Sequence, residues 1–407
     1  MSTPVFANYI AGEWIDSGKY IENRNPANTE EIVGLHPRGD AAEMARAIEA
    51  ASSAYAGWAS MPGPARGAIL YKTAEILEHE LDQLGAEMTR EEGKTLPEAK
   101  GEVKRAINIF RYYAGEGSRA GGILTPSERD RVHTFAIRKP LGVVGLITPW
   151  NFPIAIPAWK LAPALICGNT VVLKPASVSP LSSWRIVEAL HMAGVPKGVV
   201  NFITGSGGEL GRAMVDAKPV KAISFTGSND VGNWIHTEAS KRRIRIQLEM
   251  GGKNPTIVLA DADFNSAIEN TVNAAFFSTG QKCTATSRVI VEDAIYDKFL
   301  SALIERTKKL KVGNGLEAGI DIGPCVDQGQ MDTVLKYIDI GRQEAGEPRC
   351  GGHPLSDGAF AKGYFVEPTI FAGVTEDMRI AQEEIFGPVL AVMRAKDFED
   401  AMRIANA

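Results

Sequence analysis

From residue 141 the chain alternates short apolar runs with longer segments whose apolar residues recur at helical spacing. The runs are rich in β-branched residues, which is typical of strands buried on both faces of a parallel sheet. The predicted strands are 143–148, 170–174, 199–203, 222–226, 244–248 and 256–259. The predicted helices between them are 156–165, 179–193, 208–215, 230–240 and 263–278. The pattern therefore predicts an α/β fold with a parallel sheet covered on both faces by helices.

The first 120 residues predict mostly helix after a short irregular lead. Asp40, with Glu43 three positions later, has the form of a capping box that opens a helix through Ile48. A longer apolar pattern of helical period follows Pro64, and Gly93 is suited to end it.

Segment 121–140 interrupts this order, because glycines and a proline break any helix there and residues 133–139 alternate as an extended strand. The segment is either a long hairpin that leaves the domain or an ordinary surface loop.

Composition and charge exclude several classes of protein. With 407 residues, of which 44% are hydrophobic and 23% charged, the chain can bury a large core and is not disordered. A net charge of −5 argues against nucleic acid as a partner. The most apolar region, 141–173, is broken by prolines and Lys160, so we expect no membrane partner and a cytoplasmic protein. The 4 cysteines and 6 histidines lack metal-ligand spacing, so no metal site is predicted.

Ligands of parallel sheets bind beyond the carboxyl ends of the strands, so the residues that follow each strand are the first candidates for chemistry. The first predicted strand is followed by Pro-Trp-Asn-Phe-Pro at 149–153. Two prolines stiffen this backbone, and the Asn151 amide could donate to a developing oxyanion. A tight turn around a buried Trp150 is the alternative.

Three further strand ends carry polar residues. Lys174 could reach a ribose or a phosphate, or could be a solvated lysine. Ser228, at the start of a predicted helix, suits a phosphate but could equally be only an N-cap. Glu249, followed by two glycines, could be a general base or a salt-bridged carboxylate. The glycine-rich turn at 204–211 does not have the dinucleotide-binding spacing.

Cys283 is the candidate nucleophile, because its neighbours are polar, whereas Cys167 follows apolar residues and is interpreted as core. Paired carboxylates, Glu383 and Glu384, precede a rigid turn near the C-terminus. A cysteine with two carboxylates would suit hydrolysis, but no histidine has a comparable context, which weakens that hypothesis.

Seven motifs, taken in order, resemble the NAD(P)-dependent aldehyde dehydrogenase superfamily, from about Tyr9 to the end of the chain. They are PWNFP (149–153), LKPAS (173–177), FTGS (225–228), LEMGGKNP (248–255), GQKCTATSR (280–288), EPT (367–369) and EEIFGP (383–388). The segments around Glu249 and Cys283 look most like those of 2-oxoglutarate semialdehyde (2,5-dioxovalerate) dehydrogenases. The resemblance implies two doubly wound parallel-sheet domains and an aldehyde as the small-molecule substrate.

The resemblance also implies catalytic roles. The Cys283 thiolate would attack the aldehyde to give a thiohemiacetal, with the Asn151 side chain and the Cys283 N–H as the oxyanion hole. Hydride loss would leave a thioester, and Glu249 would activate the water that hydrolyses it. Lys160 matches a lysine implicated in proton relay. The residues implied to face the substrate are Trp159 and Phe152.

The cofactor implied is NADP or NAD, bound without the usual glycine fingerprint. The residues implied to bind it are Thr148, Pro149, Trp150, Lys174, Ser177, Gly207, Gly227, Ser228, Val231, Glu384 and Phe386. Relatives selective for NAD often carry Glu at the position of Ser177, where the charge repels a 2′-phosphate. We therefore expect NADP to be accepted.

The resemblance divides the chain into a cofactor-binding domain (1–120 and 141–250), an oligomerisation hairpin (121–140) and a catalytic domain (251–407). It favours the hairpin at 121–140 and implies that the full-length protein is a homo-oligomer, either a dimer or a tetramer. The chain stops inside a predicted helix at Ala407, so we expect the C-terminal end of the catalytic domain to be missing.

Several alternatives remain open. Succinate semialdehyde or a broad range of aldehydes could be the substrate, and Arg111 could bind a substrate carboxylate or be a solvated arginine. A CoA-acylating dehydrogenase is disfavoured because such relatives usually lack a carboxylate at Glu249. An inactive fragment is disfavoured because the chemical residues are intact.

Overall fold

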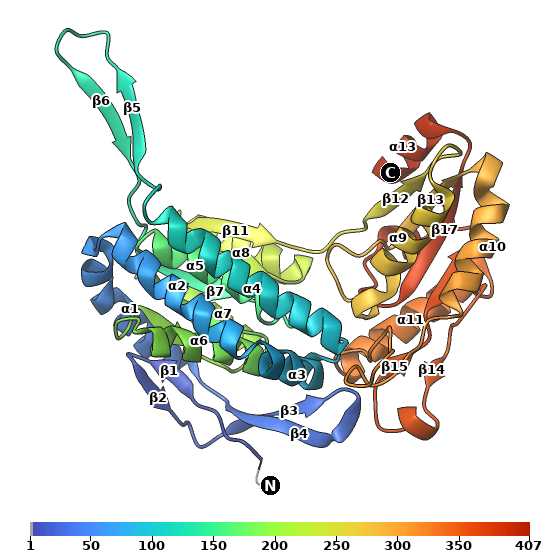
Figure 1. Ribbon diagram of the computed structural model, residues 1–407, viewed down its shortest axis with the longest axis horizontal. Helices are drawn as coiled ribbons and strands as arrows, with labels where there is room; N and C mark the ends of the chain where they lie inside the picture. Colours follow the sequence, from blue (N-terminus) through green and yellow to red (C-terminus); the bar gives the residue numbers. More distant parts are fainter. Residues whose placement is uncertain (1–2) are drawn as a thin grey trace. The chain divides into compact units, whose positions relative to one another are not determined.

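The computed structural model describes residues 3–407, and the chain divides into two compact units (Figure 1). Unit 1 comprises Met1–Asn23, Ile32–Glu91 and Ala99–Met250, and unit 2 comprises Arg24–Glu31, Glu92–Glu98 and Gly251–Ala407. Each unit contains one main sheet, largely parallel in unit 1 and wholly parallel in unit 2, with helices on both faces, which confirms the predicted fold class.

The sheet of unit 1 has the strand order β11-β10-β7-β8-β9-β1-β2. Its parallel strands are β7 (Val143–Ile147), β8 (Thr170–Lys174), β9 (Val200–Phe202), β10 (Val220–Thr226) and β11 (Arg245–Glu249). Strands β1 (Asn8–Ile10) and β2 (Glu13–Ile15) extend it in antiparallel orientation. The five predicted strands between residues 143 and 248 are thereby confirmed as neighbours in one sheet.

Successive residues of each central strand point to opposite faces, so both faces of this sheet are apolar. Val171 and Leu173 pack on one helix layer, and Val172 packs on the other. The first layer is formed by α2 (Gly63–His79), α4 (Leu96–Glu116), α5 (Ala155–Ile166) and α6 (Pro180–Ala193), with α3 (Leu81–Glu92) beside them. The second layer is formed by α1 (Ala41–Ser60), α7 (Gly207–Asp216) and α8 (Asn229–Lys241).

The predicted capping box is present, because Asp40 accepts from the Glu43 amide and the Glu43 side chain accepts from the Asp40 amide. Gly93 ends α3 with φ of +99°. The prediction of one helix after Pro64 is wrong, since Glu80 leaves helical geometry (φ −98°, ψ 9°) and separates α2 from α3. The apolar period continues across this break, so the pattern does not reveal it.

The prediction of an irregular N-terminal lead is also wrong. Besides β1 and β2, it forms the ribbon of β3 (Tyr20–Asn25) and β4 (Asn28–Pro37). Strand β1 is three residues long and carries a buried polar residue, so it gives no apolar run. Asn8 Oδ1 accepts from the backbone N–H (3.0 Å) and the hydroxyl (3.1 Å) of Thr204, a long-range contact that anchors this strand.

Segment 121–140 forms a hairpin rather than a loop. Strands β5 (Gly122–Pro126) and β6 (His133–Ile137) pair in antiparallel register, and every residue of both strands is exposed. Figure 1 shows the hairpin extending away from the helices of its own unit. Leu124 and Phe135, opposite each other in this register, are 72% and 68% exposed.

The sheet of unit 2 has the order β12-β13-β17-β16 and is parallel throughout. Its strands are β12 (Pro255–Val258), β13 (Arg288–Glu292), β16 (Thr369–Ala372) and β17 (Val389–Ala395). Helices α9 (Phe264–Phe276) and α10 (Tyr296–Thr307) cover one face, and α11 (Gln328–Ala345), α12 (Arg379–Gln382) and α13 (Phe398–Asn406) cover the other. The remaining elements are β14 (Pro354–Leu355), β15 (Phe365–Val366) and the 3-10 turns at Phe277–Gly280, Asp293–Ile295 and Gly358–Phe360.

Two short segments of the first 120 residues pack with unit 2 rather than with unit 1, namely Arg24–Glu31 and Glu92–Glu98. The tip of the β3–β4 ribbon explains the first, because Thr29 N donates to Lys362 O (2.7 Å) and Tyr364 N donates to Pro26 O (3.0 Å). These hydrogen bonds join residues more than 300 positions apart, which local sequence patterns do not reveal.

Candidate active site

The predicted site residues fall on both units. Unit 1 carries Thr148, Pro149, Trp150, Asn151, Phe152, Trp159, Lys160, Lys174, Ser177, Gly207, Gly227, Ser228, Val231 and Glu249. Unit 2 carries Cys283, Glu384 and Phe386.

The turn that follows β7 holds Asn151 in a buried position. Ser179 Oγ donates to the Trp150 carbonyl (3.1 Å) and Ser183 Oγ donates to the Pro153 carbonyl (2.8 Å), so α6 fixes the turn from one side. The Glu102 carboxylate accepts from the first backbone N–H groups of α5, at 3.0 and 3.1 Å, and caps that helix. The turn therefore has a rigid backbone, which an oxyanion donor requires.

Lys174, at the carboxyl end of β8, is a buried cation with no counter-charge among the described residues. Burial lowers the pKa of Lys174 to about 8. Among residues 3–407, no hydrogen bond or ion pair involves its Nζ, and a side chain at position 207 would begin 3.6 Å from that atom. The buried Thr148 Oγ1 also lacks a partner among the described residues. Buried polar groups are normally satisfied, so these two atoms fit the polar oxygens of a nucleotide ribose or phosphate.

Two serines complete the polar lining of unit 1. Ser177 Oγ donates to the Gly205 carbonyl (2.8 Å), across the turn from Lys174. Ser228 occupies the N-cap position of α8, but its side chain makes no capping hydrogen bond. The hydroxyl and the N–H groups of this helix start are thus available to an anion. Val231, in the first turn of α8, is 45% exposed.

Lys160 and Glu249 belong to one polar network. Lys160 Nζ donates to Ser224 Oγ (2.7 Å) and lies 3.3 Å from Gln247 Oε1. Gln247 and Glu249 lie on the same face of β11. Burial lowers the pKa of Lys160 to about 8, and the negative charge of Glu249 opposes that shift. Trp159, the preceding residue of α5, is 37% exposed, and Phe152 is half-buried.

In unit 2, the backbone before Cys283 has an unusual left-handed turn. Helix α9 ends at Phe276 rather than at the predicted Ser278, and Ser278, Thr279 and Gly280 have φ of 54°, 57° and 66°. Left-handed conformations cost about 1–3 kcal/mol at non-glycine residues and cluster at functional sites. The turn therefore requires anchors from the surrounding structure.

The anchors come from segments distant in sequence. Glu98 Oε1 accepts from the Ser278 N–H (2.7 Å) and its hydroxyl (3.0 Å), and Thr279 Oγ1 donates to the Gly323 carbonyl (3.0 Å). Asn254 Nδ2 donates to the Cys283 carbonyl (2.7 Å). The half-buried Cys283 thus lies on a backbone that is held on both sides.

Glu384 and Phe386 line the same small cavity as Asn254 and Lys282, so unit 2 does bring them beside the Cys283 loop. Burial raises the pKa of Glu384. Phe386 has φ of 58°, and Gln330 Nε2 donates to its carbonyl (2.9 Å). Cys283 precedes the amino end of β13, and Glu384 and Phe386 precede that of β17. In unit 1, by contrast, the candidates Asn151, Lys174 and Glu249 lie at or after the carboxyl ends of strands.

The other cysteines differ from Cys283 in their surroundings. Burial raises the pKa of Cys325 to about 12 and that of Cys350 to about 11, so both stay protonated. The interpretation of Cys167 as core is wrong, because this residue is exposed at the end of α5. Its neighbours Leu165 and Ile166 face the core, and the helix turns the next position outward.

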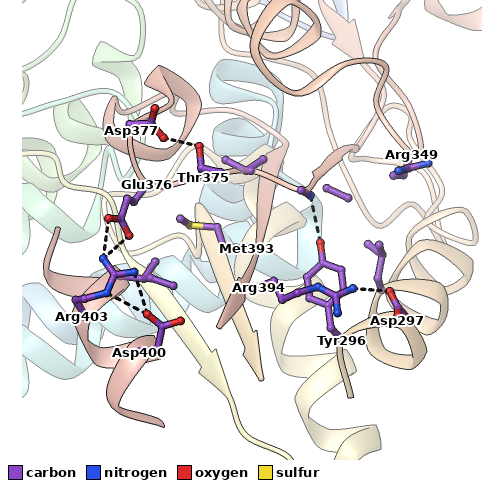
Figure 2. Close-up of a pocket in the computed structure, with 15 residues that line it drawn as sticks. Tyr296, Asp297, Arg349, Thr375, Glu376, Asp377, Met393, Arg394, Asp400 and Arg403 are labelled. Atoms are coloured by element: carbon purple, nitrogen blue, oxygen red, sulfur yellow. Dashed lines mark hydrogen bonds and ion pairs between the residues drawn. The ribbon is translucent and has the colours of Figure 1, made fainter. Parts of the chain in front are cut away.

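A cavity of about 640 Å³ at the carboxyl ends of β13, β16 and β17 contains none of the predicted site residues. Figure 2 shows Arg403 directed at Glu376 and Asp400, and Arg394 directed at Asp297. These arginines are neutralised by carboxylates of the same cavity, so no ligand is assigned to it.

Sequence reasoning missed the two buried or anchoring carboxylates, Glu98 and Glu102. Thr95 with Glu98 has capping-box spacing, which could have marked a helix start. The local sequence does not predict that Glu98 also binds Ser278 or that Glu102 binds the first N–H groups of α5. Arg111, a candidate for binding a substrate carboxylate, forms an ion pair with Glu78 instead.

Two wider features concern metals and membranes. Within residues 3–407, no three His, Cys, Asp or Glu side chains are grouped so that they could hold a metal ion. In the same range, no helix has both the length and the apolar character that a bilayer crossing needs.

Comparison with known proteins assigns the family. The model of the aldehyde dehydrogenase family matches residues 14–407. Alpha-ketoglutaric semialdehyde dehydrogenase of Bacillus subtilis (strain 168) is 48% identical over 98% of this chain and 83% of its own length. 2,5-Dioxopentanoate dehydrogenase of Saccharolobus solfataricus is 44% identical over 98% of this chain and 83% of its own length.

A crystal structure of betaine aldehyde dehydrogenase from Staphylococcus aureus, in complex with NAD+, superimposes with a TM-score of 0.96. It is 36% identical, and the match covers 98% of this chain and 80% of that chain. The resemblance drawn from the motifs is confirmed: the chain belongs to the aldehyde dehydrogenase family and is an oxidoreductase that acts on aldehydes.

Proposed function

We propose that the protein oxidises 2-oxoglutarate semialdehyde to 2-oxoglutarate with NADP or NAD as the hydride acceptor. The observation that carries this substrate is the 43–48% identity to three relatives named for alpha-ketoglutaric semialdehyde or 2,5-dioxopentanoate, over 98% of the chain. The alternatives are succinate semialdehyde and a broad range of aldehydes, including betaine aldehyde, for which a 41% identical relative is named.

Cys283 is the nucleophile of the proposed reaction. Its thiolate adds to the aldehyde carbon, and the resulting thiohemiacetal oxyanion accepts hydrogen bonds from the Asn151 amide and the Cys283 N–H. The anchored turn at 278–280 supports this role, because a nucleophile must be held in an attack geometry.

The thiohemiacetal carbon would become a thioester by loss of hydride, and a nicotinamide cofactor, when bound, would supply the hydride acceptor. Lys174 and Ser228 would hold the adenosine ribose and a phosphate, and Glu384 would bind the nicotinamide ribose beside Phe386. Two observations support this assignment. Lys174 Nζ has no partner among the described residues, and the Ser228 hydroxyl makes no capping hydrogen bond to α8. Unit 1 is accordingly the cofactor-binding domain and unit 2 the catalytic domain.

Glu249 activates the water that hydrolyses the thioester. The distinguishing variant is Glu249→Gln, which removes the general base and leaves Cys283 intact. We expect a normal burst of NAD(P)H followed by turnover at least about 100-fold slower, the usual contribution of a general base. A CoA-acylating enzyme would instead keep its turnover when CoA replaces water as the acyl acceptor.

Cofactor choice follows from Ser177, which places no negative charge beside Lys174. We expect NADP to support at least about a tenth of the efficiency that NAD supports, a difference of about 1.4 kcal/mol or less. Initial rates with both cofactors test this. Ser177→Glu should lower the NADP efficiency and spare that of NAD.

Steady-state kinetics on a panel of aldehydes tests the substrate. The panel contains 2-oxoglutarate semialdehyde, succinate semialdehyde, betaine aldehyde and propanal. The highest kcat/KM should belong to 2-oxoglutarate semialdehyde, and a preference for propanal over both oxo-acids would contradict the proposal.

The exposed hairpin β5–β6 is the proposed oligomerisation element, in a cytoplasmic homo-oligomer. Its apolar residues, among them Ile123, Leu124 and Phe135, are more than 60% exposed and form a surface suited to a second copy. Sedimentation of the wild type and of Leu124→Asp tests this role, since the charge should shift the protein towards the monomer.

A further inference from the structure

The strand that carries Glu249 also carries a second polar side chain aimed at it. Strand β11 is the edge strand of unit 1, and the exposed residues along it are Arg245, Gln247 and Glu249. Residues two positions apart in a strand lie on the same face. The Gln247 amide therefore occupies the face on which Glu249 acts.

Hydrogen bonds fix the orientation of this amide. Gln247 Nε2 donates to Glu249 Oε1 at 2.6 Å. On the other side, Gln247 Oε1 accepts from the Ser224 hydroxyl and lies 3.3 Å from Lys160 Nζ. An ammonium group can only donate and a carboxylate can only accept, so an amide with its oxygen towards Lys160 satisfies both.

The strand register and the burial of Lys160 bring Ser224, Gln247 and Lys160 together. Ser224 of β10 is the direct neighbour of Gln247 across the parallel pair. Lys160 reaches the pair from α5 and is buried, with its Nζ 2.7 Å from Ser224 Oγ. Three elements of one unit thus build a continuous chain of hydrogen bonds from a buried cation to an exposed carboxylate.

We propose that Gln247 is a positioning residue that orients the Glu249 carboxylate for water activation and links it to the Lys160 ammonium. The proposal rests on the proposed function, because it assigns Gln247 to the hydrolysis step alone. A polarised amide donates a stronger hydrogen bond, so the cation on one side tightens the hold on the carboxylate on the other. Without Gln247 the Glu249 side chain, on an exposed strand, would sample several rotamers.

The test variant is Gln247→Met, which keeps the length of the side chain and removes its hydrogen bonds with Glu249, Ser224 and Lys160. We expect the rate of NAD(P)H burst formation to be unchanged. Decay of the acyl-enzyme, followed by quenched flow, should slow about tenfold, the value of one hydrogen bond to a charged group. Ser224→Ala, which leaves the Lys160–Gln247 contact in place, should slow it less.

Hydroxylamine separates positioning from a general structural defect. It attacks a thioester without a general base, so its reaction with the acyl-enzyme should proceed at the wild-type rate in Gln247→Met. Arg245→Met is the matched control, because Arg245 lies on the same face of the same strand and, within residues 3–407, makes no hydrogen bond or ion pair with Lys160 or Glu249. Its acyl-enzyme should decay as in the wild type.

The outcomes are distinct. Wild-type acyl-enzyme decay in Gln247→Met would overturn the inference and leave the proposed function standing. Equal slowing with water and with hydroxylamine would also overturn it, since that result indicates a distorted site. Absence of any burst in the wild-type protein would instead contradict the proposed function.

Discussion

The Glu98 carboxylate should control both the stability of unit 2 and the reactivity of Cys283. It accepts four hydrogen bonds, two from Ser278 at 2.7 and 3.0 Å and two from Thr95 at 3.0 and 2.8 Å. The Ser278 pair holds a residue with φ of 54°. Glu98→Ala removes all four bonds and leaves the turn at 278–280 with fewer anchors.

The magnitude follows from these contacts. Each hydrogen bond from Ser278 to the charged acceptor contributes about 1.5 kcal/mol, and loss of the cap at Thr95 costs about 1 kcal/mol. Because water can replace part of these bonds at half-buried groups, we expect the free energy of unfolding to fall by about 2–3 kcal/mol. A displacement of Cys283 by about 1 Å should slow the NAD(P)H burst by up to about 100-fold.

Urea unfolding and stopped-flow measurement of the burst check the two effects. Glu305→Ala is the matched control in unit 2, because Glu305 makes only an exposed ion pair with Lys308 (3.2 Å), and it should change stability by less than about 0.5 kcal/mol. A Glu98→Ala protein with a wild-type burst would refute the link between the turn and the nucleophile. If the free energy of unfolding of Glu98→Ala also equalled that of the wild type, the assignment of Glu98 as an anchor would be refuted.

Three further predictions concern single groups. Iodoacetamide at pH 8 should label Cys283 much faster than Cys325, because burial raises the pKa of Cys325 to about 12, and mass spectrometry would detect the reverse order. Burial lowers the pKa of His36 from 6.5 to about 3, so between these pH values only the unfolded chain binds a proton at this residue. The free energy of unfolding should therefore fall as the pH drops below 6.5. Urea midpoints that depend on pH in the same way in the wild type and in His36→Phe would contradict this. Lys174→Met should raise the KM for NADP about tenfold with little change in the aldehyde KM, and initial rates that show equal changes in both would exclude a cofactor contact.

Much of the fold was predictable, because the buried parallel strands are continuous apolar runs and the helix starts carry capping residues. Strands β7 and β8 appear almost as predicted, and the Asp40–Glu43 capping box is present. The sequence does not predict the three-residue strand β1, since it carries a buried asparagine, Asn8, whose Oδ1 accepts from Thr204, 196 positions away. A pattern confined to neighbouring residues contains no information about such a partner.

The candidate site divides in the same way. Asn151, Lys174 and Glu249 could be selected because they follow predicted strands of a parallel sheet, and Cys283 because of its polar neighbours. The left-handed turn before Cys283 could not be predicted, since Ser278 and Thr279 rarely adopt φ near +55° without external anchors.

By itself the sequence determined the α/β class, the order of the strands along the chain and the chemical groups available at the strand ends. These properties depend on local periodicity and residue type. Tertiary structure alone decided that Lys174 is buried without a counter-charge, that Glu98 holds the turn before Cys283 and that Gln247 joins Lys160 to Glu249. Burial and hydrogen bonding arise from contacts between distant segments, so the same carboxylate or amine acquires its role only when the chain is folded.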